Sequence, residues 1–142
     1  MIFSRIILVA GAVMAAVGLW LTASALLIPL KAAVAQFLLQ RAWDTTLAGG
    51  EQVRPWPWSD TWPVARLRLP DQEADLIVLA GASGQALAFG PGHVTGTAIP
   101  GEEGISVIGG HRDTHLSVLA GMRPGHRVEV QRADGAVRRF LV

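Results

Sequence analysis

The distribution of apolar and polar residues divides the chain into parts of different character. The first part is a run from Ile6 to Leu30, IILVAGAVMAAVGLWLTASALLIPL, in which no residue is charged. About 20 consecutive apolar residues in a helix cross the hydrocarbon core of a bilayer, and this run is longer than that. It also exceeds the apolar core of a cleaved signal peptide, although the small residues at Ala33–Ala35 would suit a cleavage site. We therefore expect residues 6–30 to form a single transmembrane anchor, preceded by a cytoplasmic segment of residues 1–5.

The charges around this run give only a weak indication of its orientation. Arg5 precedes the run, and Lys31 and Arg41 follow it, so the positive-inside rule is nearly balanced. We interpret the run as an uncleaved anchor with the carboxy-terminal part of the chain outside the cytoplasm. The chain contains no cysteine, which excludes structural disulfides but is compatible with either redox compartment.

Residues 31–63 are expected to form a helical extension and then an extended lead-in. Four apolar residues at three- and four-residue spacings predict one apolar helix face, Val34, Phe37, Leu38 and Ala42, and Gly49 and Gly50 would end that helix. The lead-in that follows, EQVRPWPWSDTWP, contains three prolines, which forbid a regular helix. Its three tryptophans could pack against one end of a β domain or lie among lipid headgroups.

From Val64 onward the pattern is typical of β-structure. Residues 64–70, VARLRLP, alternate between two faces, and ADLIVLA is a short apolar run that turns at a glycine. The glycine-rich segment that follows predicts a loop with one helical turn. Residues 105–110, ISVIGG, predict a strand that is buried on both faces.

The last part of the chain predicts a short helix and a hairpin. Asp113 is a candidate N-cap for a helix over DTHLSVLAGM. Asp134 and Gly135 then supply the turn between two alternating strands. Phe140 and Val142 share a face of the last strand, and nothing after them in the sequence would cover it, an arrangement that folded domains avoid. We therefore expect residues 64–142 to form a small, mainly β domain that is incomplete.

The net charge of +1 and the scattered basic residues give no reason to expect nucleic-acid binding. The densest group of reactive side chains is VIGGHRDTH, which ends in His111, Arg112, Asp113, Thr114 and His115. These residues could form a polar loop at the end of a strand. His111, Asp113 and His115 could instead bind a metal, although a tetrahedral zinc site needs another firm ligand. A serine hydrolase is a weaker alternative, because Ser83 lacks the G-x-S-x-G spacing of a nucleophile elbow.

A resemblance to one family rests on residues 106–135, SVIGGHRDTHLSVLAGMRPGHRVEVQRADG. It continues upstream through WPWSDTWPVARLRLP and LIVLAGASGQALAFGPGHVTGTAIPGEEG. These stretches resemble the sortases, membrane-anchored cysteine transpeptidases, and in particular the branch of Gram-negative bacteria called class GN or marine proteobacterial sortases. The resemblance covers most of residues 56–142.

The resemblance implies a sortase-like β-barrel, with His111 as the catalytic histidine. In this role His111 protonates the leaving amine and deprotonates the incoming nucleophile. Arg112 to His115 would shape the site, and His93 would be structural. The family's cysteine and arginine lie on the two strands after the hairpin, which this sequence does not contain, and Arg138 and Arg139 belong to the strand before them. The resemblance implies no cofactor and no metal.

These observations lead to one main hypothesis and two alternatives. The main hypothesis is a sortase-type transpeptidase in the bacterial inner membrane, facing the periplasm. It would act on a secreted protein with a C-terminal sorting signal and on an amine acceptor. As given, the chain would be inactive, either as a fragment that stops before its nucleophile or as a degraded relative. The alternatives are an inert membrane-tethered module that binds peptides, and a metal-dependent hydrolase that uses His111, Asp113 and His115.

Overall fold

The computed structural model describes residues 2–142, which divide into two compact units that meet between Val34 and Ala35. One helix, α1 (Ile2–Leu47), contributes to both units. By length and composition, α1 is able to cross a membrane. The helix ends where the paired glycines predict, because Gly49 adopts φ +98°, a left-handed conformation that glycine tolerates best. The predicted long helix and its end are therefore confirmed.

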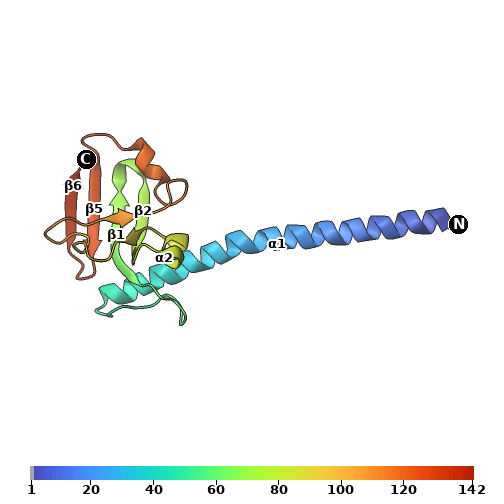
Figure 1. Ribbon diagram of the computed structural model, residues 1–142, viewed down its shortest axis with the longest axis horizontal. Coiled ribbons are helices and arrows are strands. Elements are labelled where there is room, and N and C mark those ends of the chain that lie inside the picture. Colours follow the sequence, from blue (N-terminus) through green and yellow to red (C-terminus); the bar gives the residue numbers. More distant parts are fainter. Residues whose placement is uncertain (1) are drawn as a thin grey trace. The chain divides into compact units, whose positions relative to one another are not determined.

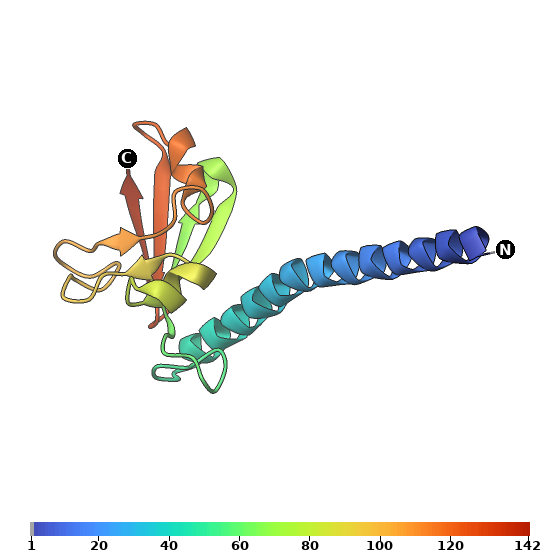
Figure 2. The ribbon, with the colours of Figure 1, turned by 45° about the vertical axis from the view of Figure 1, so that its right-hand side comes forward.

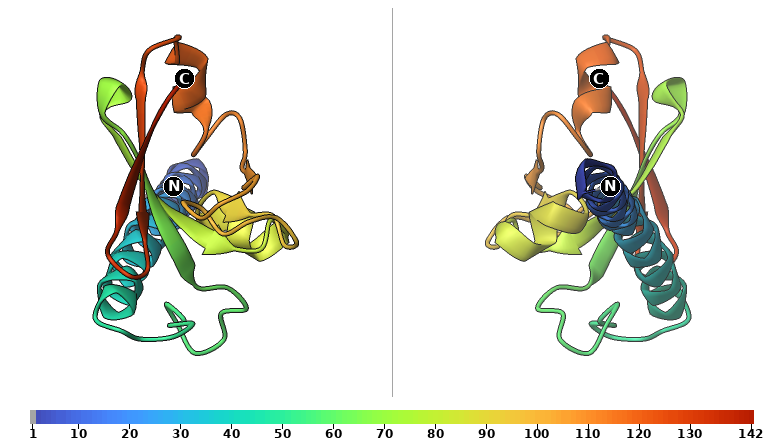
Figure 3. Two further views of the ribbon diagram at one scale, coloured as in Figure 1. Left: turned by 90° about the vertical axis from the view of Figure 1, so that its left-hand side faces the viewer. Right: turned by 90° about the vertical axis from the view of Figure 1, so that its right-hand side faces the viewer.

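The second unit is built on a six-stranded sheet with the order β4-β3-β2-β1-β5-β6 (Figure 1). Its strands are β1 (Pro63–Leu69), β2 (Ala74–Ala80), β3 (Gly92–His93), β4 (Ile108–Gly109), β5 (Arg127–Arg132) and β6 (Val137–Leu141). Neighbouring strands are antiparallel, except for the parallel pair β2 and β3. The sheet curls into an open half-barrel, with the β5–β6 hairpin on one side and α2 and β3 on the other (Figure 3).

The alternating pattern of residues 64–70 correctly predicts the two faces of β1. Ala65, Leu67 and Leu69 are buried, whereas the residues between them are only half-buried. The hairpin is confirmed as well: Gly135 takes φ +83°, and the Asp134 side chain accepts a hydrogen bond of 3.0 Å from the backbone N–H of Ala136.

Two local predictions are wrong. The expected strand over residues 105–110 is reduced to Ile108 and Gly109, and Ile105 is 82% exposed. Ile105 lies in a loop instead, where its carbonyl accepts a hydrogen bond from the N–H of Ala98 at 3.0 Å. The expected helix begins later and is a 3₁₀ helix, η2 (Ser117–Gly121), and its N-terminus is not capped by Asp113. Residues 112–116 form turns in its place.

The expectation of a mainly β chain also needs correction, because the content is mixed. Helix α1 alone contains 46 residues, whereas the longest strands contain seven. The second unit adds the short helix α2 (Gly84–Phe89) and the 3₁₀ helix η1 (Pro70–Gln72), which connects β1 to β2.

The second unit contains two hydrophobic clusters. The first lies on the inner face of the sheet and consists of Ala65, Leu67, Leu69, Val78 and Val130. The second joins Leu39 of α1 to Leu79 of β2 and Ala86 of α2. Figure 2 shows α2 beside the last turns of α1. These turns are therefore a core element of the β unit, and Trp43 within them is fully buried. The apolar face predicted for this helix is wrong at Val34 and Phe37, which are 49% and 67% exposed, because the helix turns Leu39 toward β2 and α2 instead.

The two outer strands of the sheet differ in their surroundings. Strand β4 carries the loop that contains His111, and β6 is exposed along its whole length. Phe140 and Val142, the two residues that the sequence predicts on one face of the last strand, are 49% and 52% exposed. The apolar surface that the sequence predicts at this strand is thus present in the structure.

Candidate active site around His111

His111 lies two residues after strand β4, where the chain leaves the sheet. Its side chain is exposed, and its backbone carbonyl accepts hydrogen bonds from the N–H groups of Thr114 (3.3 Å) and Leu116 (3.2 Å). The chain therefore turns back immediately after the histidine, so that the imidazole lies at a tight corner beside the outer strand of the sheet.

The glycine before His111 allows a close approach of two segments. A Cβ atom at Gly110 would lie 2.8 Å from both Cγ and Cδ1 of Leu116, closer than real Cβ atoms come to their neighbours. The side chain of Leu116 thus occupies the space that any other residue at position 110 would need. This packing fixes the turn that contains His111.

The four residues after His111 form the outer part of the same turn. Arg112, Asp113 and Thr114 are exposed, and His115 is half-buried. The Arg112 guanidinium lies 3.5 Å from the Asp113 carboxylate, but both side chains are about nine-tenths exposed, so the ion pair contributes little stability. Thr114 accepts hydrogen bonds at its carbonyl from the N–H and the hydroxyl of Ser117. These contacts support a loop-forming role for residues 112–115.

The far end of the His111 loop is tied to the β1–β2 connection through Gln72. The side-chain amide of Gln72 donates a hydrogen bond to the carbonyl of Gly121 at 3.3 Å and contacts Nδ1 of His126 at 2.8 Å. The backbone N–H of Arg123 also points to this nitrogen, at 3.3 Å. Because an N–H can only donate, Nδ1 accepts both bonds and His126 carries its proton on Nε2. His126 therefore has a structural role.

An ion pair next to His126 strengthens the same junction. The carboxylate of Asp71 accepts a hydrogen bond from the backbone N–H of Arg127 at 2.7 Å, and the Arg127 guanidinium lies 3.2 Å away. The backbone hydrogen bond, followed by the guanidinium, lowers the pKa of Asp71 below its ordinary value. The start of β5 is thereby held against η1.

His93, the last residue of β3, is held through its Nε2 by the loop that follows the strand. Its Nε2 lies 2.9 Å from the carbonyl of Ala98 and 3.0 Å from the hydroxyl of Thr97. Since a carbonyl only accepts, Nε2 carries the proton and donates it. These bonds support the structural role expected for His93, and they leave His111 as the exposed histidine next to the sheet.

A cavity of about 500 Å³ lies beside β2 and β3, and its lining does not include His111. Asp60, Thr61, Ser83 and His93 are among the residues that line it, together with apolar residues. The metal alternative receives no geometric support. Within residues 2–142, no three side chains of the types His, Cys, Asp and Glu come together in a way that could hold a metal ion.

Residues 67–142, from the middle of β1 to the end of the chain, match the family model described as "Sortase domain". This match covers more than half of the chain. The chain belongs to the sortase family. No curated protein sequence matches it.

Solved sortases share the fold of this sortase chain. Sortase A from Corynebacterium diphtheriae matches with a TM-score of 0.54 and 21% identity, over 78% of this chain and 64% of its own. A Clostridium perfringens sortase D5 transpeptidase matches with a TM-score of 0.56 and 18% identity, over 77% of this chain and 71% of its own. Sortase C-1 from Actinomyces oris matches with a TM-score of 0.51 and 29% identity, over 56% of this chain and 48% of its own. The chain thus spans about two thirds of the first of these relatives and about half of the third.

Sequence reasoning identified the histidine loop but not the residues that support it. Gln72 and Asp71 lie about 50 residues before their partners in the sequence, and a polar turn of the form Pro-Asp-Gln is common in any fold. Gly110 carried a weak signal, since the Gly-Gly pair before His111 indicates a place where the backbone is closely approached.

Proposed function

We propose that this sortase-family chain carries the proton-transfer part of a membrane-anchored transpeptidase, with His111 as its general acid and base. The observation that carries this proposal is the position of His111, exposed at a glycine-fixed turn directly after β4, inside the region that matches the sortase model. The other histidines of the sheet region, His93 and His126, are held by hydrogen bonds within loops.

In the proposed reaction, a cysteine thiolate attacks the carbonyl carbon of a peptide bond in a C-terminal sorting signal. The C–N bond breaks, the departing amine takes a proton from the His111 imidazolium, and a thioester forms. An acceptor amine then attacks the thioester, neutral His111 takes a proton from it, and the thiolate leaves. Arg112, Asp113, Thr114 and His115 shape the loop around this proton transfer.

The thiolate of this reaction does not come from the 142 residues, because they contain no cysteine. We expect no thioester and no ligated product when the purified chain is mixed with a sorting-signal peptide and an amine. The family further implies a substrate that is a secreted protein with a sorting signal. We propose the class GN branch, with the domain on the periplasmic side of the bacterial inner membrane and α1 as its anchor.

The test begins with the nucleotide sequence after codon 142. Because the chain spans 64% of a sortase A, we expect the reading frame to encode a further strand that ends in cysteine and then a strand with an arginine. In that protein, His111→Ala should lower kcat/KM by about 10²–10⁴-fold, the usual contribution of a general acid and base. The matched variant His115→Ala should lower it by less than about tenfold. Equal losses in the two variants, or full activity of His111→Ala, would contradict the proposed role.

A second candidate is an inert membrane-tethered module that binds peptides in the cavity of about 500 Å³ beside β2 and β3. A stop codon directly after codon 142, together with saturable binding of a sorting-signal peptide to the folded chain, would support this candidate over the transpeptidase.

A further inference from the structure

The segment between α1 and β1 presents one large apolar side chain to solvent. Trp58 is 79% exposed, whereas Trp56 and Trp62 of the same segment are half-buried. An indole is large and apolar but carries one N–H donor, a combination that suits the boundary between lipid and water.

The backbone holds Trp58 at the corner of a turn. The N–H of Ser59 donates to the carbonyl of Trp56 at 3.0 Å, so Pro57 and Trp58 are the two central residues of a β-turn. Ser59 is buried, and its hydroxyl donates to the carbonyl of Thr61 at 2.8 Å. Proline is the favoured residue at the first central position because its φ is already fixed. Trp58 is therefore presented by a constrained turn.

This turn lies at the end of the β unit where α1 enters it. The ring of Trp56 contacts that of Phe89 edge-on, with centroids 4.8 Å apart. The carbonyl of Phe89 accepts a hydrogen bond of 2.8 Å from the side-chain amide of Gln36. The segment of residues 48–62 connects the end of α1 to β1 (Figure 1). Trp58 thus lies two residues after Trp56, whose ring contacts Phe89, and Phe89 is hydrogen-bonded to Gln36 of α1.

The sequence places Gln36 close to the end of the apolar run. Five residues lead from Leu30 to Ala35, the first buried residue of α1 in the β unit. Even fully extended, five residues span at most about 18 Å, and as a helix they span about 7.5 Å. If Ile6–Leu30 crosses a bilayer, this end of the β unit must lie near the headgroups at any angle between the two units.

We propose that Trp58 inserts into the lipid–water boundary beside the anchor and thereby fixes how the β unit faces the membrane. The same segment carries three exposed charged residues, Glu51, Arg54 and Asp60, so the indole and not the charge provides its affinity for the lipid–water boundary. The occupant of this surface is therefore a phospholipid bilayer. The inference rests on the membrane anchorage proposed above.

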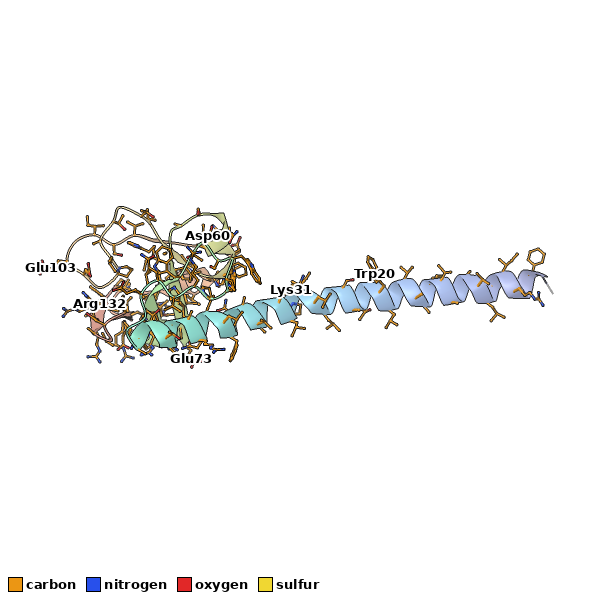
Figure 4. All side chains as sticks on the ribbon, turned by 90° about the horizontal axis from the view of Figure 1, so that it is seen from below. Trp20, Lys31, Asp60, Glu73, Glu103 and Arg132 are labelled. Carbon is orange, nitrogen blue, oxygen red and sulfur yellow. The ribbon has the colours of Figure 1, made fainter. Side chains whose placement is uncertain are left out.

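The chain itself provides the controls for a test by fluorine NMR of the fluorotryptophan-labelled full chain in phospholipid nanodiscs. Trp20 of α1 is 68% exposed and projects from the apolar run (Figure 4). Trp43 is fully buried in the β unit. Single Trp→Phe variants at positions 20, 43, 58 and 62 assign the four resonances that are compared. Two probes are compared: lipids with a nitroxide near the headgroup or at the acyl-chain end, and a water-soluble gadolinium chelate.

We expect the Trp58 signal to be lost with the headgroup nitroxide and retained with the aqueous chelate. The Trp20 signal should be lost with the nitroxide at the acyl-chain end, and the Trp43 signal should survive the chelate. If Trp20 responds as expected but Trp58 is lost only with the chelate, the docking of Trp58 is wrong while the anchorage stands. If Trp20 is also lost with the chelate and not with either lipid probe, the anchorage itself is wrong and the docking falls with it.

A second measurement tests how the β unit is oriented on the membrane, through the exposure of Trp62 to the aqueous chelate. Relative to unchanged protein, Trp58→Ser should increase the chelate-induced broadening of Trp62, because the β unit would lift from the headgroups. The matched change Ile105→Ser, at a residue 82% exposed in a loop between β3 and β4, should leave it unchanged. Equal broadening in both variants would overturn the inference.

Discussion

A single methyl group at position 110 tests how the histidine turn is packed. In Gly110→Ala the new Cβ would lie 2.8 Å from two carbons of Leu116, so the turn or the leucine must move. We expect a loss of about 1–3 kcal/mol in the free energy of unfolding, the usual cost of overpacking. The measurement is urea unfolding of the full chain in detergent micelles, followed by tryptophan fluorescence.

The adjacent glycine is the matched control. A Cβ at Gly109 would meet only Ala82 at 3.8 Å, an ordinary contact. Gly109→Ala should therefore leave the free energy of unfolding unchanged or raise it by up to about 1 kcal/mol, because alanine restricts the unfolded chain. Similar losses in the two variants would show that the close packing of Leu116 is not what the turn requires.

The pair of Asp71 and Arg127 gives stability a dependence on pH. The pKa of Asp71 is lowered in the folded state, so its contribution is present above the ordinary value of 3.8 and is lost as the pH falls through the folded value. The urea midpoint of the protein should therefore fall as the pH is lowered from about 5 to below 3. In Asp71→Asn this fall should be smaller, and in the control Glu103→Gln, an exposed carboxylate in Figure 4, it should be unchanged. An unaltered pH dependence in Asp71→Asn would contradict this account.

At the level of single residues, the sequence indicates which residues are candidates for a role better than it indicates which hydrogen bonds they make. It identified His111 as the candidate through its neighbours and through resemblance, but it misassigned Asp113 as a helix cap. A cap depends on which carbonyl the following N–H groups reach. Here the carbonyl of His111 accepts two of them, which turns the chain before a helix can begin. Such competition between nearby partners cannot be seen in a list of residue types.

Among the elements, the last turns of α1 are the part whose role the sequence indicated least clearly. Leu39 is 1% exposed and packs against Leu79 and Ala86. Leu39→Ala should lower the free energy of unfolding by about 2–5 kcal/mol through lost burial and a cavity. Phe37→Ala, two residues earlier at a position 67% exposed, should change it by no more than about 0.5 kcal/mol. Urea unfolding in detergent compares them, and a neutral Leu39→Ala would mean that α1 is not part of the β unit's core.

Regular periodicity made the long elements predictable. The apolar run, the alternation in β1 and the β5–β6 hairpin each repeat over enough residues to determine their conformation. The strand predicted for residues 105–110 was wrong because their apolar side chains do not alternate with polar ones. Most of that stretch forms loop contacts with residues 94–98, and only Ile108 and Gly109 pair with β3. Continuous apolar composition without alternation does not show whether a short segment is paired.

For the whole molecule, the proposed anchor makes a direct prediction about extraction. Residues 6–30 bear no charge, and the side chains of this run that the structure describes are almost all exposed along α1. The full chain should therefore stay in the membrane pellet after alkaline carbonate washing, because about 20 apolar residues in lipid resist extraction. A variant that lacks residues 2–30 should be recovered in the soluble fraction with its β unit folded, as judged by the fluorescence of buried Trp43. Release of the full chain by carbonate would contradict the anchorage.

The continuity of α1 affects how proteolysis could release the β unit from the membrane. Proteases cleave backbone that can be drawn out into an extended form, and no loop separates Leu30 from Ala35. The first accessible site is the segment of residues 48–62, but a nick there leaves Leu39 and Trp43 still embedded in the β unit. A single cut would thus leave two fragments held together by non-covalent packing. The β unit would be released from the membrane only after it had unfolded around the end of α1.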